Sequence, residues 1–514
     1  MPPFSRRAAL AGGLGLFAAV GLAACGASGT GGAAESKVVL RWVAEAGPTS
    51  WDPVVSGSGA QFRMLALAHA SLTEIDEQGV AQPGLAQSWK YNAKGDQITF
   101  TLRPNLKFTD GTPVNGQAVK AYLERARTQE NSALAGDLTS IKSISVKGET
   151  DVTLHLTQTD YQIPLLLGQR VAQITSEQAA KNPDAVNASP DGAGPFKVTE
   201  LVVGSHAYFE KNPDYWDAAN IKIDRVELSF GIDASTVVSS LQTGVYDFAA
   251  LAPSQIQAAK DAGLDVVYQP GFNASNISIN ANKAPFNDPA VLLATRHAIN
   301  RQEFVEKVTF STGTTTAQPF PSGYIAYDEA SADLWSYDVE KAKQILADAG
   351  YTANDPRLTV DFVVSATSSS TANELVQAQL AAIGITANIK VDTNWTTPFF
   401  AKDLVLSTYG TTGRESPVQT LTAHFGPKGP LNLSGPYTSE KFQAAVKVAR
   451  ETPLESPDYA ENLKAATRAG VRDTPTIFTY RQPNIFVKTK AVSDLPAVPG
   501  QLHWEGVTVQ PESE

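Results

Sequence analysis

The residue with the most distinctive chemical context is Cys25, which is the only cysteine in the sequence. It follows Leu22-Ala23-Ala24 and precedes Gly26, so small side chains stand next to a thiol. A signal peptidase needs small side chains before its cut, and the new N-terminal cysteine then carries thioether-linked and amide-linked acyl chains. Two or more acyl chains hold a protein stably on a membrane, whereas a single chain binds only marginally. The pattern therefore predicts lipidation of Cys25, for example by palmitate.

The residues before this cysteine have the composition of an export signal. Arg6-Arg7 gives a positive start, and an apolar stretch rich in Ala, Gly and Leu follows from Ala8 to Ala24. A short transmembrane helix is the alternative, but a span needs ~20 apolar residues and few glycines. The paired arginines leave open export by the general secretory route or the twin-arginine route. We predict a signal peptide over residues 1–24 and a flexible Gly/Ser-rich tether over residues 25–36.

The rest of the sequence lacks the common catalytic motifs. It has no Gly-x-Ser-x-Gly nucleophile elbow, no His-Glu-x-x-His zinc motif and no Gly-Lys-Ser/Thr phosphate loop. Its six histidines are scattered, with no two within one helical turn: His69, His155, His206, His297, His424 and His503. Asp and Glu are abundant, so a carboxylate pair of the glycosidase type could still form in space. We predict no catalytic residues, no metal site and no cofactor, and keep a secreted lipid-anchored hydrolase as the alternative.

Charge and composition exclude one class of partner. The chain has 52 acidic and 41 basic residues, a formal net charge of -11, so it lacks the positive footprint of a nucleic-acid-binding protein. Of its 514 residues, 42% are hydrophobic, which is enough for large cores in two or three domains.

Short strands and amphipathic helices alternate after the tether. Four segments have the period-two pattern of half-buried strands: Ile98–Leu102, Val152–Leu156, Val226–Phe230 and Asn276–Asn280. Three others have helical periodicity or start and stop signals: Asp338 to Gly350, Val376 to Gly384, and a helix from Asn300 with Glu303 placed for a capping box. The sequence therefore predicts a mixed α/β fold.

A series of short blocks also follows in order along nearly the whole chain after the tether. The blocks are Trp51-Asp52-Pro53, Pro83–Trp89, Thr99–Val114, Gly192–Phe196, Lys211–Trp216, Leu241–Asp247, Pro285–Asp288, Arg296–Arg301 and Ala342–Tyr351. Together they resemble family 5 extracellular solute-binding proteins, the peptide, nickel and dipeptide receptors of ABC importers. Two of the blocks contain simple turns, Asp110-Gly111-Thr112-Pro113 and Asn212-Pro213-Asp214. We therefore expect the blocks to build the scaffold rather than to contact a ligand.

The resemblance implies a two-lobed α/β fold of the periplasmic-binding-protein type, type II, with a ligand cleft between the lobes and an extra subdomain in lobe I. By analogy, lobe I takes residues 38–272 with the subdomain at about 57–190, lobe II takes 273–483, and 484–514 returns to lobe I. Gln269-Pro270-Gly271 and Gln482-Pro483 are the expected hinge segments, because Pro and Gly clusters mark the ends of packed elements.

Peptide receptors of this family use an acidic residue for the peptide amine, in a segment corresponding to Tyr409–Pro417. This sequence lacks the expected aspartate there; Glu415 is the only acid, and Arg414 stands beside it. A guanidinium fork pairs bidentately with a carboxylate, so the departure favours a carboxylated ligand, although a ligand with both charges remains open. Arg170 falls where lobe I approaches the cleft in relatives and is a second candidate clamp. Each arginine could instead form a salt bridge of little energetic value.

Three aromatic residues are candidates for stacking on an apolar part of the ligand: Trp51, Trp395 and Tyr409. The resemblance then implies a monomeric, lipid-anchored receptor on the extracytoplasmic face of the cell membrane, facing the periplasmic space where one exists. Its expected partners are a small-molecule or peptide ligand, the permease subunits of an ABC transporter, and the membrane through the lipid on Cys25. A receptor for a metal chelate, such as nickel held by an organic ligand, is a further alternative.

Overall fold

A computed structural model describes residues 37–44, 46–56, 59–353, 355–411, 414, 416–435, 439–498 and 500–510. Lys37–Glu514 form one compact unit. The predicted signal peptide and tether, with Cys25, lie outside the described residues, and so does Glu415.

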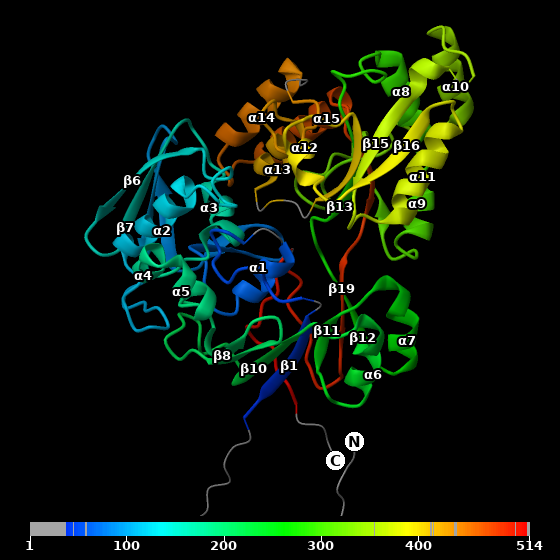
Figure 1. Cartoon of the computed structure of the whole chain (residues 1–514). Helices are drawn as coiled ribbons and strands as arrows, with labels where there is room; N and C mark the ends of the chain where they lie inside the picture. Colours follow the sequence, from blue (N-terminus) through cyan, green and yellow to red (C-terminus); the bar gives the residue numbers. More distant parts are fainter. Residues whose placement is uncertain are drawn as a thin grey trace, which may run out of the picture. The chain divides into compact units, whose positions relative to one another are not determined.

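The first of two large sheets has seven strands, in the order β12-β19-β11-β1-β10-β9-β8. Their bounds are β1 (Val39–Ala44), β8 (Phe196–Val202), β9 (His206–Lys211), β10 (Arg225–Phe230), β11 (Phe248–Ala250), β12 (Asp265–Gln269) and β19 (Asn484–Lys488). β1 pairs in parallel with β10 and β11, while β19 runs antiparallel between β11 and β12. The chain therefore returns to this sheet after leaving it for more than two hundred residues (Figure 1).

The second large sheet has six strands, in the order β14-β18-β13-β17-β15-β16. Their bounds are β13 (Ala274–Ile279), β14 (Thr314–Thr315), β15 (Thr359–Ser365), β16 (Thr386–Asp392), β17 (Leu406–Thr411) and β18 (Ile477–Arg481). Helices cover both of its faces (Figure 1). One apolar core joins it to α8 (Pro289–Ala298), α9 (Arg301–Lys307), α10 (Val339–Asp348) and α11 (Ser370–Ala381). Another core joins it to α13 (Pro417–Phe425), α14 (Glu440–Glu451) and α15 (Tyr459–Asp473).

Two smaller sheets lie within the segment predicted as a subdomain. One pairs β2 (Thr73–Ile75) with β3 (Ala81–Pro83), and the other has the order β4-β5-β7-β6. The strands of the latter are β4 (Ala86–Tyr91), β5 (Gln97–Leu102), β6 (Ile141–Lys147) and β7 (Asp151–Leu156). The helices of this region are α1 (Gly59–Leu65), α2 (Gly116–Thr128), α3 (Ile163–Leu166), α4 (Glu177–Lys181) and α5 (Pro183–Ala188). One continuous core joins this region to the seven-stranded sheet.

The remaining helices are short. They are α6 (Val237–Gln242), α7 (Ile256–Asp261), α12 (Thr396–Phe400) and the 3-10 helices η1 (Arg170–Ala172), η2 (Ala234–Thr236), η3 (Pro253–Gln255), η4 (Glu329–Ser331) and η5 (Pro356–Leu358). No helix among the described residues has both the length and the apolar character needed to span a membrane.

The chain crosses between the two large sheets twice, and the two crossings lie side by side. β12 ends at Gln269 before β13 begins in the other sheet, and β18 ends at Arg481 before β19 begins. The Arg481 Nη2 donates to the carbonyl of Gly271 at 2.6 Å, and Asn273 donates to the side chain of Asn484 at 3.0 Å. Both crossings overlap the predicted hinge segments, while their hinge role and the lobe limits remain predictions.

The strands and helices read from the sequence periodicity are all present. The Asp338 side chain caps α10 by accepting from the Lys341 N–H at 2.9 Å, and Gly350 leaves that helix with a φ of +80°. The predicted capping box at Asn300 is wrong, although Asn300 does cap the helix. Asn300 does accept from the Gln302 N–H, but its own N–H donates to Gln379 of α11 at 3.0 Å rather than to Glu303.

The Glu303 carboxylate instead accepts from the same Gln379 amide at 2.9 Å. The buried Gln379 amide of α11 thus bonds to both the Asn300 N–H and the Glu303 carboxylate, which a capping box would have paired with each other.

Candidate ligand-binding site

A cavity of about 330 Å³ opens at the six-stranded sheet. It is lined by residues of β13, β17 and β18, by the end of β15 and the turn after it, and by the start of α11. The lining residues are Ser275, Asn276, Ile277, Phe304, Ser365, Thr367, Ser368, Ser369, Ala372, Asn373, Val376, Trp395, Thr408, Tyr409, Gly410, Thr479 and Tyr480. Its size falls within the ~300–1,000 Å³ typical of small-molecule sites.

Two of the predicted stacking residues form one wall of this cavity. The rings of Trp395 and Tyr409 are stacked, with centroids 5.7 Å apart and planes 14° apart, and Phe399 packs behind both. The Trp395 Nε1–H donates to Ser407 Oγ at 2.8 Å, which fixes the indole and leaves it only 6% exposed. Burial raises the pKa of Tyr409 although Arg414 opposes the shift, so the phenol is neutral. This wall can receive an apolar or aromatic group.

The other walls of the cavity carry polar groups without charge. Thr408 Oγ1 donates to Asn373 Oδ1 at 2.7 Å, and Asn373 Nδ2 donates to Ser368 Oγ at 2.8 Å. Asn276 is buried on β13 and accepts from Ser278 Oγ at 2.7 Å. These groups could orient a neutral ligand part, but they supply no counter-ion.

The two predicted arginines meet at a third residue, Asp137. Arg170 Nη2 pairs with one carboxylate oxygen of Asp137, and Arg414 Nε lies 3.6 Å from the other. All three side chains are mostly buried, with exposed fractions of 13% for Arg170, 14% for Asp137 and 23% for Arg414. Burial alone would raise the pKa of Asp137, but Arg170 and Arg414 outweigh it and hold that pKa below its ordinary value. Asp137 is therefore a carboxylate.

Local structure positions this charge cluster. Arg170 opens η1, and its guanidinium lies 5.7 Å from the ring centroid of Phe62. The backbone of Arg414 is tied to the first turn of α13, because its N–H donates to Thr420 Oγ1 at 3.1 Å. The chain segment of Arg414 is thus anchored in the part that holds the six-stranded sheet, whereas Arg170 and Asp137 belong to the part that holds the subdomain sheets.

A second cavity, of about 410 Å³, lies between these two parts of the chain. It is lined by Gly136, Asp137, Thr139, Ser140, Thr157, Gln158, Asp160, Gln162 and Leu166 on one side, and by Ser416, Val418, Gln419, Thr422 and Arg450 on the other. Gln162 Oε1 crosses between the sides by accepting from Ser416 Oγ at 3.1 Å and from the Tyr459 hydroxyl at 2.8 Å. This cavity differs from the first one because charged residues line it.

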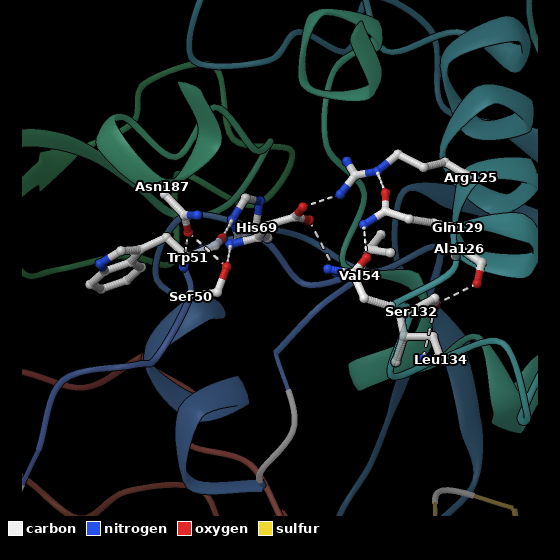
Figure 2. A network of polar contacts seen from close by, with 12 residues as sticks. Ser50, Trp51, Val54, His69, Arg125, Ala126, Gln129, Ser132, Leu134 and Asn187 are labelled. Carbon is white, nitrogen blue, oxygen red and sulfur yellow. Dashed lines mark hydrogen bonds and ion pairs between the residues drawn. The ribbon is translucent and has the colours of Figure 1, made fainter. Parts of the chain in front are cut away.

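Trp51 lies apart from both cavities. Its side chain is 5% exposed and packs on Phe209 in the core of the seven-stranded sheet. Figure 2 shows its backbone in a polar network in which its N–H donates to Asn187 at 2.8 Å and its carbonyl meets His69 at 3.3 Å. The neighbouring Asp52 pairs with Arg125 in the same network. A contact between Trp51 and a ligand remains a prediction without support from these positions.

Several residues around the cavities carry no recognisable signal in the sequence. Asp137 lies in the loop between α2 and β6, with its N–H bonded to the carbonyl of Leu134, and no motif marks it. Asp160 and Gln162 lie in the loop between β7 and α3, and no motif marks them either. Among the described residues, no group of three or more His, Cys, Asp or Glu side chains could hold a metal ion.

Comparison with known proteins places this geometry in a family. Residues 80–432 match the family model of bacterial extracellular solute-binding proteins, family 5. The glutathione-binding protein GsiB of Salmonella typhi is 31% identical over 348 residues, which cover 66% of this chain and 67% of that protein.

Two solved structures show the same fold. AgaA of A. tumefaciens R10, in complex with agropinic acid, has a TM-score of 0.79 at 24% identity over 92% of this chain and 99% of its own. DppA of Helicobacter pylori, a periplasmic binding protein in complex with the peptide STSA, has a TM-score of 0.78 at 20% identity over 92% of this chain and 98% of its own. The predicted fold class, an α/β periplasmic-binding-protein-like fold of type II, is confirmed. The chain belongs to family 5 of the bacterial extracellular solute-binding proteins.

Proposed function

We propose that this protein is the substrate-binding component of an ABC importer, lipid-anchored through Cys25 on the extracytoplasmic face of the membrane. It captures a carboxylated organic solute, such as an oligopeptide or glutathione, between its lobes and delivers it unchanged to the permease subunits. It acts as a monomer, since a receptor of this kind needs no second copy to enclose its ligand.

The observation that carries the choice of solute is the meeting of Arg170 and Arg414 on one carboxylate. Asp137 lies at ion-pair distance from both guanidinium groups, which supports the fit of a carboxylate between them. A ligand carboxylate can share or replace that position as the parts of the protein close around it. Glutathione and peptides both carry such a group, and these are ligands named for relatives of this chain.

The stacked Trp395 and Tyr409 support a second element of the proposal. They give the uncharged cavity one aromatic wall, against which a side chain or other apolar part of the solute can pack. The ligand thus needs a charged end and a less polar body, which is the chemistry of a short peptide rather than of an inorganic ion.

A binding panel tests the proposal. Full-length protein is purified without denaturation and titrated with glutathione, the peptide STSA, agropinic acid and a nickel–histidine complex, with thermal unfolding as readout. A saturating ligand at 100 times its dissociation constant adds about 2.7 kcal/mol of stability. Mass spectrometry then checks that the solute leaves with its bonds intact. Stabilisation by no member of the panel, or turnover of a bound solute, contradicts the proposal; turnover would favour a hydrolase.

A further inference from the structure

The charged cavity between Asp160 and Arg450 is large enough for a distinct part of a ligand. Its volume of about 410 Å³ lies within the range of ~300–1,000 Å³ for small-molecule sites. Its lining is rich in hydroxyl and amide groups and includes a carboxylate on one side and a guanidinium on the other. Asp137, the other acid of the cavity, is already neutralised by two arginines.

One buried donor in this lining has no partner. Gln162 is 3% exposed, and its Oε1 is occupied by the hydroxyls of Ser416 and Tyr459. Its Nε2 has no hydrogen-bond partner among the described residues. Leaving such a group unpaired costs about 1–3 kcal/mol, so the site favours an acceptor atom at this position.

The charged groups of Asp160 and Arg450 interact electrostatically but form no ion pair among the described residues. Asp160 is buried, and its Oδ1 accepts from the Gln162 N–H at 2.9 Å, which fixes the carboxyl group. Arg450, on α14, is held near it because the Arg450 carbonyl accepts from the Tyr161 N–H at 3.0 Å. The positive charge of Arg450 acts on Asp160, yet the described residues form no ion pair between the two. A ligand part with both charges can fit between them.

We propose that this cavity binds the zwitterionic α-amino-acid head of the solute. The α-ammonium group donates to the carboxylate of Asp160, and the α-carboxylate accepts from the guanidinium of Arg450 and from Gln162 Nε2. The inference rests on the proposed function and narrows its solute class to compounds with a free α-amino-acid head, such as γ-glutamyl peptides. These carry a free ammonium and a free carboxylate on the same carbon, whereas the amino terminus of an ordinary peptide lacks the adjacent carboxylate.

Binding of this head depends on pH with a defined sign. Burial raises the pKa of Asp160 to about 6, against the opposing effects of the Gln162 N–H and Arg450. The ammonium group needs the ionised form, so affinity falls as the pH drops below about 6. The other titratable groups coupled to Asp160 are Tyr91 of β4 and Tyr459 of α15, whose pKa values burial raises, so they stay neutral throughout.

The test compares three probes by isothermal titration calorimetry on the full-length protein: glutathione, glutathione acetylated at its α-amine, and tri-alanine. Asp160→Asn and Arg450→Gln should each weaken glutathione binding about tenfold or more, because a charge-assisted hydrogen bond is lost. Acetylation should weaken binding to the wild type by a similar factor, and tri-alanine should bind less tightly than glutathione. The loss of affinity below pH 6 should be absent in Asp160→Asn.

Two exposed residues supply matched controls, and thermal unfolding checks that every variant folds. Asp214→Asn removes a carboxylate that pairs with Lys107, and Lys447→Gln removes a cation from the helix of Arg450. Neither control should change glutathione affinity. Equal binding by wild type, Asp160→Asn and Arg450→Gln, or binding only of solutes without the α-amino-acid head, overturns the inference and leaves the proposed function intact. Failure of the wild type to bind any solute of the wider panel defeats the proposed function instead.

Discussion

Asp137, Arg170 and Arg414 form a mostly buried charge cluster, which under the proposed function selects a carboxylated ligand. Two guanidinium groups lie around one carboxylate in a mostly buried place. Desolvating these groups is costly, and the cost is offset only while the charges stay well paired. Under the proposed function, a ligand carboxylate that enters this cluster pairs with a guanidinium group, which an uncharged analogue cannot do.

Arg414→Ala should therefore remove most of the thermal stabilisation that glutathione gives to the wild type. The expected loss of binding free energy is about 2–5 kcal/mol, the usual effect of truncating one partner of a buried charge pair. Arg357→Ala is the matched control, because Arg357 is 61% exposed and its ion pair is with Asp355, two residues away in sequence. An Arg414→Ala variant stabilised as strongly as the wild type would show that this arginine does not hold the carboxylate.

Glu74 is a second residue whose surroundings set its charge. It lines a small cavity with His503 and Glu505, where burial raises the pKa of Glu74 to about 7, with Glu505 adding to the shift and His503 opposing it. Its folded-state pKa thus lies above its ordinary value of 4.5. At a pH between about 4.5 and about 7, Glu74 therefore stays protonated in the folded protein but is ionised in the unfolded chain.

The free energy of unfolding should consequently fall as the pH rises from about 4.5 to about 7. His503, whose pKa the neighbouring Glu505 raises against the effect of burial, contributes a slope of the same sign at higher pH. Glu74→Gln should flatten the slope in the lower window, measured by urea unfolding at several pH values. The exposed Glu461→Gln is the control, and an unchanged slope in Glu74→Gln would mean that Glu74 is ionised throughout.

At the scale of elements, one sequence block that looked like a family signature has a packing reason. The block Gly192–Phe196 passes directly over the turn at Ala68 and His69, where the Gly194 N–H donates to the Ala68 carbonyl at 2.9 Å. A Cβ on Gly194 would lie 2.5 Å from the Ala68 carbonyl carbon and 2.6 Å from the His69 nitrogen. Only glycine allows two backbones to approach so closely.

Gly194→Ala should lower the free energy of unfolding by at least about 1–3 kcal/mol, because backbone on both sides must move. Gly136→Ala is a suitable control, since a Cβ there meets nothing within 4 Å. Urea unfolding of the two variants makes the comparison. Equal stability of Gly194→Ala and the wild type would show that the close approach can relax without cost.

At the scale of the whole molecule, the contacts across the second cavity bear on how a ligand could stabilise a closed arrangement. Gln162 bonds to Ser416 and Tyr459, and the Tyr161 N–H bonds to the Arg450 carbonyl, so polar contacts join the two sides there. A ligand that bonds to both sides stabilises the closed arrangement by its differential affinity and shifts the population toward it. The transporter can then distinguish loaded from empty receptor by shape.

The membrane anchor is testable at the same scale. Cys25→Ser should move the protein from the membrane fraction to the soluble extracytoplasmic fraction, because the thioether-linked chain has no attachment point. Cell fractionation with detection of the protein gives the answer, and metabolic labelling with a fatty acid checks the modification. Ser28→Ala, in the tether, is the control. Retention of Cys25→Ser on the membrane would point to an uncleaved apolar segment as the anchor.

Local signals sufficed for the elements, and they failed where a partner came from elsewhere in the fold. The cap at Asp338 and the turn at Asp110 depend on bonds within a few residues, and both are present. The capping box at Asn300 failed because Gln379, from another helix, took both bonds. Trp395 and Tyr409 were predicted as two separate stacking candidates. That their rings stack on each other follows only from the tertiary structure.

The sequence by itself determined the family, the α/β class and the alternation of strands and helices. It also singled out Arg170 and Arg414 as candidate ligand-binding residues. Only the tertiary structure decided that both arginines meet on Asp137, that Trp51 is buried in a core, and that Gln162 bonds to Tyr459 across 297 residues. Backbone propensity and capping act over one or two turns of chain, and so a sequence displays them directly. Ion pairs and cavities depend on which distant segments the hydrophobic cores bring together, and no local sequence pattern encodes those long-range contacts.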